Sequence, residues 1–124
     1  MIIYFDGGAR PNPGLMSHAF VTSEGYEYYE TTERGTNNEA EWFACMAAVQ
    51  HAIDQGVDEA VIRGDSLLVI NQIKGVWKIK VPEFRVYRAK VIEWVGDRHY
   101  SFEHVLRDQN PAGKLIERKY AEGL

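Results

Sequence analysis

Three strand-like segments stand at the start of the chain, ahead of any helical pattern. Residues 1–5 form a continuous apolar run, and residues 15–22 and 26–32 are also strand-like. The second and third segments are separated by a short connection that contains Gly25, as in a β-hairpin. We therefore expect an antiparallel meander of three strands, so the chain builds a sheet before its first helix.

The connection between the first two strands is rich in turn-forming residues. Residues 6–14 contain three glycines and two prolines. We therefore expect the first strand to end near Phe5 and a loop to follow it.

Helical patterns begin at Thr36, which forms a capping box with Glu39 and precedes a run of helix formers that ends at Gly56. Later segments are predicted as a strand over 60–64, helices over 66–74 and 82–95, a strand over 100–106, and a last helix opened by Asn110 and Pro111. The order βββαβααβα predicts an α/β fold in which helices pack on a mixed five-stranded sheet.

The size of the chain fits one hydrophobic core. Its 124 residues, 45% of them hydrophobic, predict a single domain over residues 1–124. No apolar run approaches the roughly 20 residues that span a bilayer, and no basic segment precedes the apolar start, so we expect a cytoplasmic protein without a membrane partner. Cys45 is the only cysteine and is predicted to be a buried thiol.

Three acidic residues occupy positions where they can act together. Asp6 and Asp65 each follow an apolar strand, and Glu41 lies in the first turns of the long helix. Each alone has an ordinary explanation, because Asp favours turns and helix caps and Glu favours helix N-termini. Carboxylates that converge at one sheet edge, however, repel one another unless a cation lies between them. Such oxygen ligands select Mg²⁺ or Mn²⁺, and pairs of these ions serve in phosphodiester hydrolysis.

The net charge of −4 argues against a nucleic-acid-binding protein, since phosphates attract Lys and Arg. Part of this acidity is explained if carboxylates at a site are neutralised by bound cations. The net charge therefore excludes neither a nucleic-acid-binding protein nor a protein with a metal site.

Four motifs in this order make the sequence similar to the type 1 ribonucleases H, and more closely to their compact archaeal and plant-like branch without a basic protrusion. The motifs are YFDGGARPNPG over 4–14, TNNEAE over 36–41, GDSLLV over 64–69 and HVLRDQN over 104–110. The resemblance implies a ribonuclease H-like fold and a monomeric, metal-dependent endonuclease that cuts the RNA strand of RNA–DNA hybrids with two ions, Mg²⁺ or Mn²⁺. Related enzymes of the archaeal type also cut double-stranded RNA, and the sequence leaves this activity open.

The resemblance also assigns residues. It implies that Asp6, Glu41 and Asp65 are the catalytic, metal-binding carboxylates, and it leaves Glu39 in its capping role. Substrate contacts are implied for four further residues: Asn12, Asn37 and Asn38 at RNA 2′-hydroxyls, which distinguish RNA from DNA, and Thr36 at a DNA phosphate. As alternatives, Asn12 is a turn residue, and Asn37 and Asn38 are polar residues of a first helical turn.

Lys114 departs from the family pattern, because relatives carry a fourth carboxylate there. We treat Lys114 as a candidate catalytic residue that replaces the charge of one metal or holds the scissile phosphate. The alternatives are that it faces solvent, or that the fourth ligand has moved to Asp108 or Glu117. A rival function follows from the same residue: a catalytically weak module that binds hybrids without cutting them efficiently.

Overall fold

The computed structural model describes residues 1–123 and confirms the expected order of elements. In chain order these are β1 (Ile2–Arg10), β2 (Gly14–Thr22), β3 (Glu27–Gly35), α1 (Asn37–Asp54), β4 (Glu59–Gly64), α2 (Leu67–Ile73), α3 (Pro82–Val95), β5 (His99–His104), the 3₁₀ turn η1 (Arg107–Gln109) and α4 (Pro111–Ala121).

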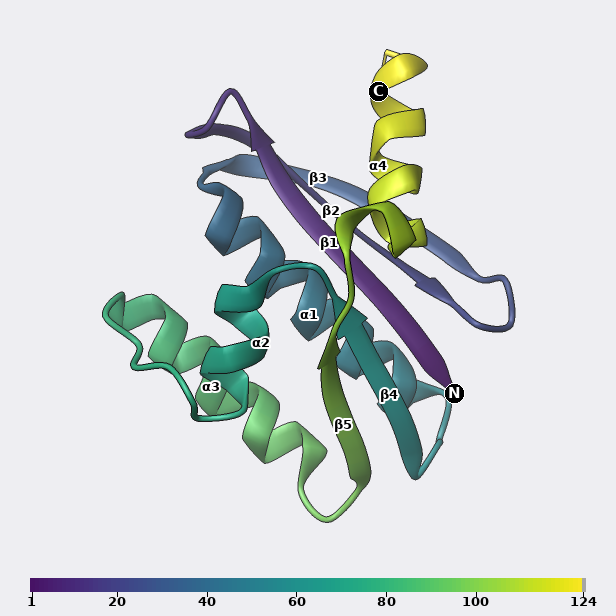
Figure 1. The fold of residues 1–124 in the computed structure, drawn as a ribbon, viewed down its shortest axis with the longest axis vertical. Coiled ribbons are helices and arrows are strands. Elements are labelled where there is room, and N and C mark those ends of the chain that lie inside the picture. Colours follow the sequence, from purple (N-terminus) through teal and green to yellow (C-terminus); the bar gives the residue numbers. More distant parts are fainter. Residues whose placement is uncertain (124) are drawn as a thin grey trace.

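The strands form one mixed sheet in the order β3-β2-β1-β4-β5 (Figure 1). β1 to β3 are an antiparallel meander, as expected, whereas β4 and β5 run parallel to β1. β1 therefore lies at the centre of the sheet, with an antiparallel neighbour on one side and a parallel neighbour on the other.

Helices cover both faces of the sheet, because successive residues of a strand point to opposite sides. On β2, Phe20 belongs to the main core beneath α1, whereas Ala19 packs with Leu115 of α4. Figure 1 shows α1 behind the central strands and α4 apart from the other three helices. The main core includes Trp42 and Cys45 of α1, both fully buried, which confirms the buried thiol.

β1 is longer than the sequence indicated. It continues through the glycines to Arg10, so the expectation of a strand ending near Phe5 is wrong. The reason is pairing: Gly7 and Gly8 lie opposite His18 and Ser17 of β2, and this ladder holds a segment whose composition favours a turn. The turn itself is confined to residues 11–13.

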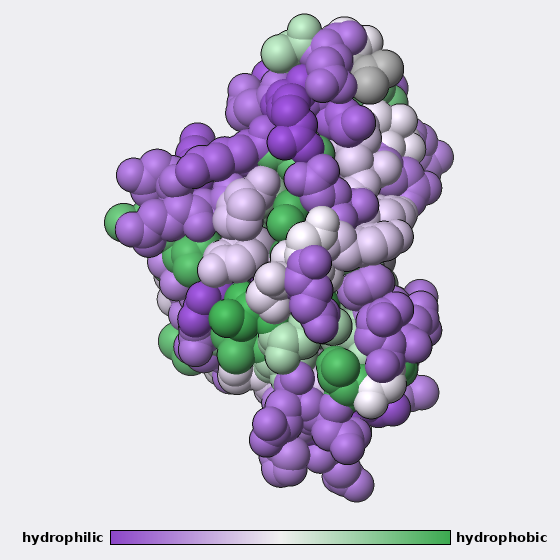
Figure 2. All heavy atoms as spheres, turned by 90° about the vertical axis from the view of Figure 1, so that its right-hand side faces the viewer, coloured by the Kyte–Doolittle hydropathy of each residue, from purple (hydrophilic) through white to green (hydrophobic). Residues whose placement is uncertain are grey.

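The exposed surface is largely polar on the side that carries β3 and α4. Figure 2 shows hydrophilic residues over most of this face, with apolar residues in separate groups. Among residues 1–123, no helix combines the length and apolar character that crossing a membrane requires.

Gly7 and Gly8 give a direct test of the packing between α1 and β1. A Cβ at Gly7 would lie 2.2 Å from the Ala40 carbonyl oxygen, whereas a Cβ at Gly8 meets no atom closer than 3.7 Å. We expect Gly7→Ala to lower the free energy of unfolding by about 1–3 kcal/mol or more, because the helix must move. Gly8→Ala should change it by no more than about 0.5 kcal/mol. Urea denaturation of both variants measures the difference, and equal effects would contradict the close contact.

Candidate functional site

Asp6 and Asp65 lie at equivalent points of two neighbouring strands. β1 and β4 are parallel, and Phe5 pairs with Gly64 in their register. The next residue in each case is an aspartate: Asp6 lies within β1 and Asp65 directly follows β4, so the two side chains lie side by side at the carboxyl end of β4. The parallel pairing brings together two carboxylates that are 59 positions apart in sequence.

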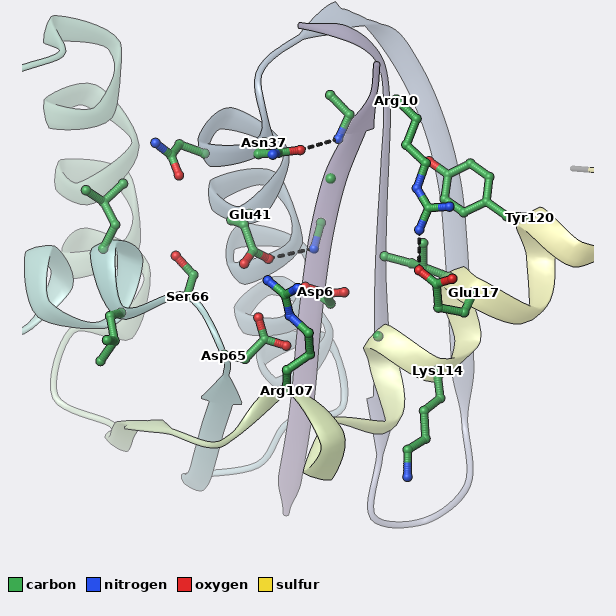
Figure 3. A pocket seen from close by; sticks show the side chains of 18 of the residues that line it. Asp6, Arg10, Asn37, Glu41, Asp65, Ser66, Arg107, Lys114, Glu117 and Tyr120 are labelled. Carbon is green, nitrogen blue, oxygen red and sulfur yellow. Dashed lines mark hydrogen bonds and ion pairs between the residues drawn. The ribbon is translucent and has the colours of Figure 1, made fainter. Parts of the chain in front are cut away.

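Glu41 joins them from the first turns of α1. This helix passes so close to β1 that only a glycine fits at position 7, and the Gly7 N–H donates a hydrogen bond of 2.6 Å to Glu41 Oε1. One carboxylate oxygen from each of Asp6, Glu41 and Asp65 lies within 4.8 Å of the others. Figure 3 shows the three side chains converging from β1, α1 and the end of β4.

Glu41 is buried at the site, and Asp6 and Asp65 are half-buried. Burial, with the charge of Asp65 as the next cause, raises the pKa of Asp6 to about 7. Hydrogen bonds from Glu41 and the Gly7 backbone and the charge of Arg107 act in the opposite direction. Burial also raises the pKa of Glu41 well above its usual range, and the charges of Asp6 and Asp65 add to this effect.

Such a cluster fits a hard divalent cation. The three side chains offer anionic oxygens, which Mg²⁺ and Mn²⁺ prefer, and their mutual repulsion is relieved when a cation binds between them. Without a cation the cluster retains protons instead, as the raised pKa of Asp6 indicates. The donor set and its electrostatics therefore suit a metal site.

Asn110, which the sequence predicts only as a helix cap, also contacts Asp65. Its Nδ2 donates to the Phe5 carbonyl (2.9 Å) and to Asp65 Oδ2 (3.0 Å). Its Oδ1 accepts from the Ala112 N–H, which confirms the cap of α4. Asn110 is fully buried and thus joins α4, β1 and the carboxylate cluster. The cap signal located it, but the contact with Asp65 depends on tertiary packing.

Arg107 is a second residue without a role assigned from sequence. Figure 3 shows its side chain extending from η1 toward the three carboxylates, and its charge lowers the pKa of Asp6. Arg107 lies in a short turn between β5 and α4, where no helix or strand pattern in the sequence indicated that its side chain would face the carboxylates.

The carboxylates open into a cavity of about 740 Å³, lined by residues of β1, α1, α2, η1 and α4. Asn37 and Asn38 line it, and both are exposed. Asn37 also has a structural bond, because its Oδ1 accepts from the Ala9 N–H at 2.8 Å.

Asn12 and Thr36 lie at the start of α1. Asn12 Oδ1 accepts from the Asn37 N–H, and Thr36 Oγ1 accepts from the Glu39 N–H, which is the capping bond expected for Thr36. Glu39 accepts a hydrogen bond from the Tyr87 hydroxyl. The four proposed substrate residues therefore lie around one helix N-terminus, and all four are exposed.

Lys114 lines the cavity but does not approach the carboxylates. Figure 3 shows its side chain extending away from Asp6 and Asp65. The α4 residue that faces Asp6 is Gly113, and a Cβ there would lie 3.1 Å from Asp6 Oδ2. Because successive helical residues are rotated by about 100°, Lys114 is turned away. Asp108 and Glu117, the alternative ligands, also line the cavity, and Glu117 forms an ion pair with Arg10.

Comparisons with known proteins agree on one family. The family model described as "Reverse transcriptase-like" matches residues 14–116. "Ribonuclease HI" of Halobacterium salinarum is 39% identical over 113 residues, which cover 86% of this chain and 57% of the relative. "Bifunctional protein Rv2228c" of Mycobacterium tuberculosis is 35% identical over 120 residues, which cover 89% of this chain and 32% of the relative. The chain thus spans about half or less of the length of these curated relatives.

Two solved structures are similar over nearly their whole length. The crystal structure of RNase H1 from Halobacterium salinarum superposes with a TM-score of 0.84 at 36% identity, covering 93% of this chain and 92% of that chain. LC11-RNase H1, solved in complex with an RNA/DNA hybrid, gives a TM-score of 0.82 at 32% identity, covering 92% and 91%. With this fold, these relatives and the three converging carboxylates, the chain belongs to the type 1 ribonuclease H family.

Proposed function

We propose that this chain is a ribonuclease H that hydrolyses the RNA strand of RNA–DNA hybrids, with Asp6, Glu41 and Asp65 as ligands of two divalent cations, Mg²⁺ or Mn²⁺. One observation carries the proposal: carboxylate oxygens from three separate elements lie within 4.8 Å of one another at the floor of an open cavity. The family relationship supplies the reaction class, and the complex of LC11-RNase H1 with an RNA/DNA hybrid supports the substrate.

The residues of the chain hold this site in a fixed geometry. The Gly7 N–H orients Glu41, and the Asn110 amide orients Asp65. One carboxylate oxygen of Asp6 lies within 4.8 Å of an oxygen from each of the other two. A bound divalent cation supplies the activation of water and the charge stabilisation that phosphodiester hydrolysis requires. Arg107 extends toward the same place, where it can contact a phosphate.

The substrate residues lie on one side of the carboxylates. Asn12, Asn37 and Asn38 present amides that can hydrogen-bond 2′-hydroxyls, and Thr36 stands at the start of α1, where helix N–H groups favour a phosphate. Their common exposure leaves them accessible to a duplex.

The rival function, a module that binds hybrids without cutting them efficiently, is not favoured. It required the Lys114 ammonium in place of a metal, whereas the Lys114 side chain extends away from the carboxylates. We place Lys114 instead at the edge of the cavity, where its charge can attract the nucleic-acid backbone.

We further propose that the enzyme is monomeric and cytoplasmic. Its substrate range can be tested on a gel that compares cleavage of labelled hybrid, double-stranded RNA and double-stranded DNA.

The carboxylates can be tested individually. Asp6→Asn, Glu41→Gln and Asp65→Asn should each lower hybrid cleavage by orders of magnitude without loss of folding, because each removes a metal ligand. Glu39→Gln is the matched control, two residues from Glu41 and bonded to Tyr87, and it should retain cleavage. Cleavage of labelled hybrid and circular dichroism measure both properties. An inactive Glu39→Gln beside an active Glu41→Gln would overturn the assignment.

The raised pKa of Asp6 predicts how stability depends on pH. The folded protein retains a proton up to pH of about 7, whereas Asp in the unfolded chain loses it near 3.8. Without divalent cations, this group therefore lowers stability as pH rises from about 4 to 7, because the folded state binds more protons. Mg²⁺ should raise the melting temperature more at pH 8 than at pH 5, and Asp6→Asn should remove most of this difference. An equal effect of Mg²⁺ at both pH values would contradict the coupling.

The two asparagines of α1 should differ in their effects. Asn38→Ala should weaken binding to hybrid more than binding to DNA duplex, because an amide at a 2′-hydroxyl contributes to the discrimination of RNA from DNA, whereas phosphate contacts contribute to the affinity for both duplexes. Asn37→Ala should additionally lower stability, since it loses the bond to the Ala9 N–H. Binding titrations with both duplexes and thermal denaturation separate these effects, and equal losses on both duplexes for Asn38→Ala would refute its role.

A further inference from the structure

We propose that Glu117, three residues after Lys114, is the fourth carboxylate of this metal site. In the absence of substrate, Arg10 binds Glu117 and keeps it away from the cation, and a nucleic-acid phosphate replaces Glu117 as the partner of Arg10. The inference rests on the proposed function and deepens it. It is carried by the geometry of α4 and by the contacts of Glu117.

α4 approaches the carboxylates at a residue without a side chain. A Cβ at Gly113 would lie 3.1 Å from Asp6 Oδ2 and 4.0 Å from Asp65 Oδ2. Any larger residue at this position would crowd the two aspartates. Gly113 therefore lets α4 lie close to the two aspartates, where a side chain from the next turn of the same helix face can reach the site.

Glu117 is placed to reach the carboxylates. It lies four residues after Gly113, so the two share one face of the helix, and helical side chains lean toward the N-terminus. The Glu117 carboxylate can therefore extend back over Gly113 toward Asp6. It already lines the same cavity as the three carboxylates, and Figure 3 shows it on the Asp6 side of α4.

Arg10 is the present partner of Glu117, and the pair is easily exchanged. The two side chains are 52% and 67% exposed, and exposed ion pairs contribute little to stability. Arg10 does not depend on Glu117 for its position, because its guanidinium also lies 3.8 Å from the centroid of the Tyr120 ring.

A nucleic-acid phosphate competes directly for Arg10. Guanidinium groups bind phosphates through paired hydrogen bonds, and Arg10 lines the cavity that the duplex would occupy. When a phosphate replaces Glu117 at Arg10, the released carboxylate can turn to the cation site. Substrate binding and the completion of the metal site are thereby coupled.

The test uses Mn²⁺ alone with the full chain, and free Mn²⁺ is measured by electron paramagnetic resonance. Arg10→Gln should strengthen the weaker Mn²⁺ site several-fold by releasing Glu117, and Arg10→Gln/Glu117→Gln should lose this gain. The matched control is Glu27→Gln, which removes the exposed pair of Glu27 with Arg118, a second link between α4 and the sheet, and it should not change Mn²⁺ binding. With hybrid present, Glu117→Gln should raise the Mg²⁺ concentration for half-maximal cleavage about tenfold, which corresponds to about 1.4 kcal/mol.

An unchanged Mn²⁺ affinity in Arg10→Gln, or the same gain in Arg10→Gln and Arg10→Gln/Glu117→Gln, would overturn the role of Glu117. If Asp6→Asn leaves Mn²⁺ binding intact, the proposed function itself fails; loss of binding in Asp6→Asn with no effect of Glu117 or Arg10 rejects only this inference.

Discussion

The close contact between α1 and β1 at Gly7 is the constraint on which the site depends. Because position 7 has no side chain, the Ala40 carbonyl lies against the strand, and the Gly7 N–H reaches Glu41. A wider separation would draw Glu41 away from Asp6 and Asp65. The parallel register of β1 and β4 places the other two carboxylates, so one packing distance and one strand pairing determine the whole cluster.

The cluster opposes the stability of the fold that holds it. Burial and mutual repulsion raise the pKa of Asp6 and Glu41, which means that their charged forms are disfavoured in the folded chain. Buried Asn110 offsets part of this cost with hydrogen bonds to Asp65 and to the backbone of β1. The folded chain thus carries an unfavourable electrostatic free energy among these carboxylates. A bound cation would remove this repulsion, and the free energy gained would add to the metal affinity.

The sequence predicted the features with local signals and missed those that arise from packing. The helix caps at Thr36 and Asn110 follow from residue type and spacing, and the structure contains both. The end of β1 was misplaced because Gly and Pro favour turns, whereas pairing with β2 keeps Gly7 and Gly8 in the strand. The contact of Asn110 with Asp65 joins residues 45 positions apart, and no local pattern encodes it. The direction of the Lys114 side chain depends on the rotation of α4 against the sheet, which spacing alone does not give.

An acidic chain can bind a polyanion if charge at the site, and not the net charge of −4, governs the encounter. Five acidic and three basic side chains line the cavity: Asp6, Glu41, Asp65, Asp108 and Glu117, with Arg10, Arg107 and Lys114. Two divalent cations would change the net charge of this lining from negative to positive. Nucleic acid would then meet a positive site on a negative molecule. In the metal-free form, protons retained by Asp6 and Glu41 reduce the negative charge of the lining, so this form would attract nucleic acid less than the loaded form. Under this arrangement, metal loading would favour the binding of nucleic acid as well as its hydrolysis, and the carboxylates that destabilise the fold would contribute to both.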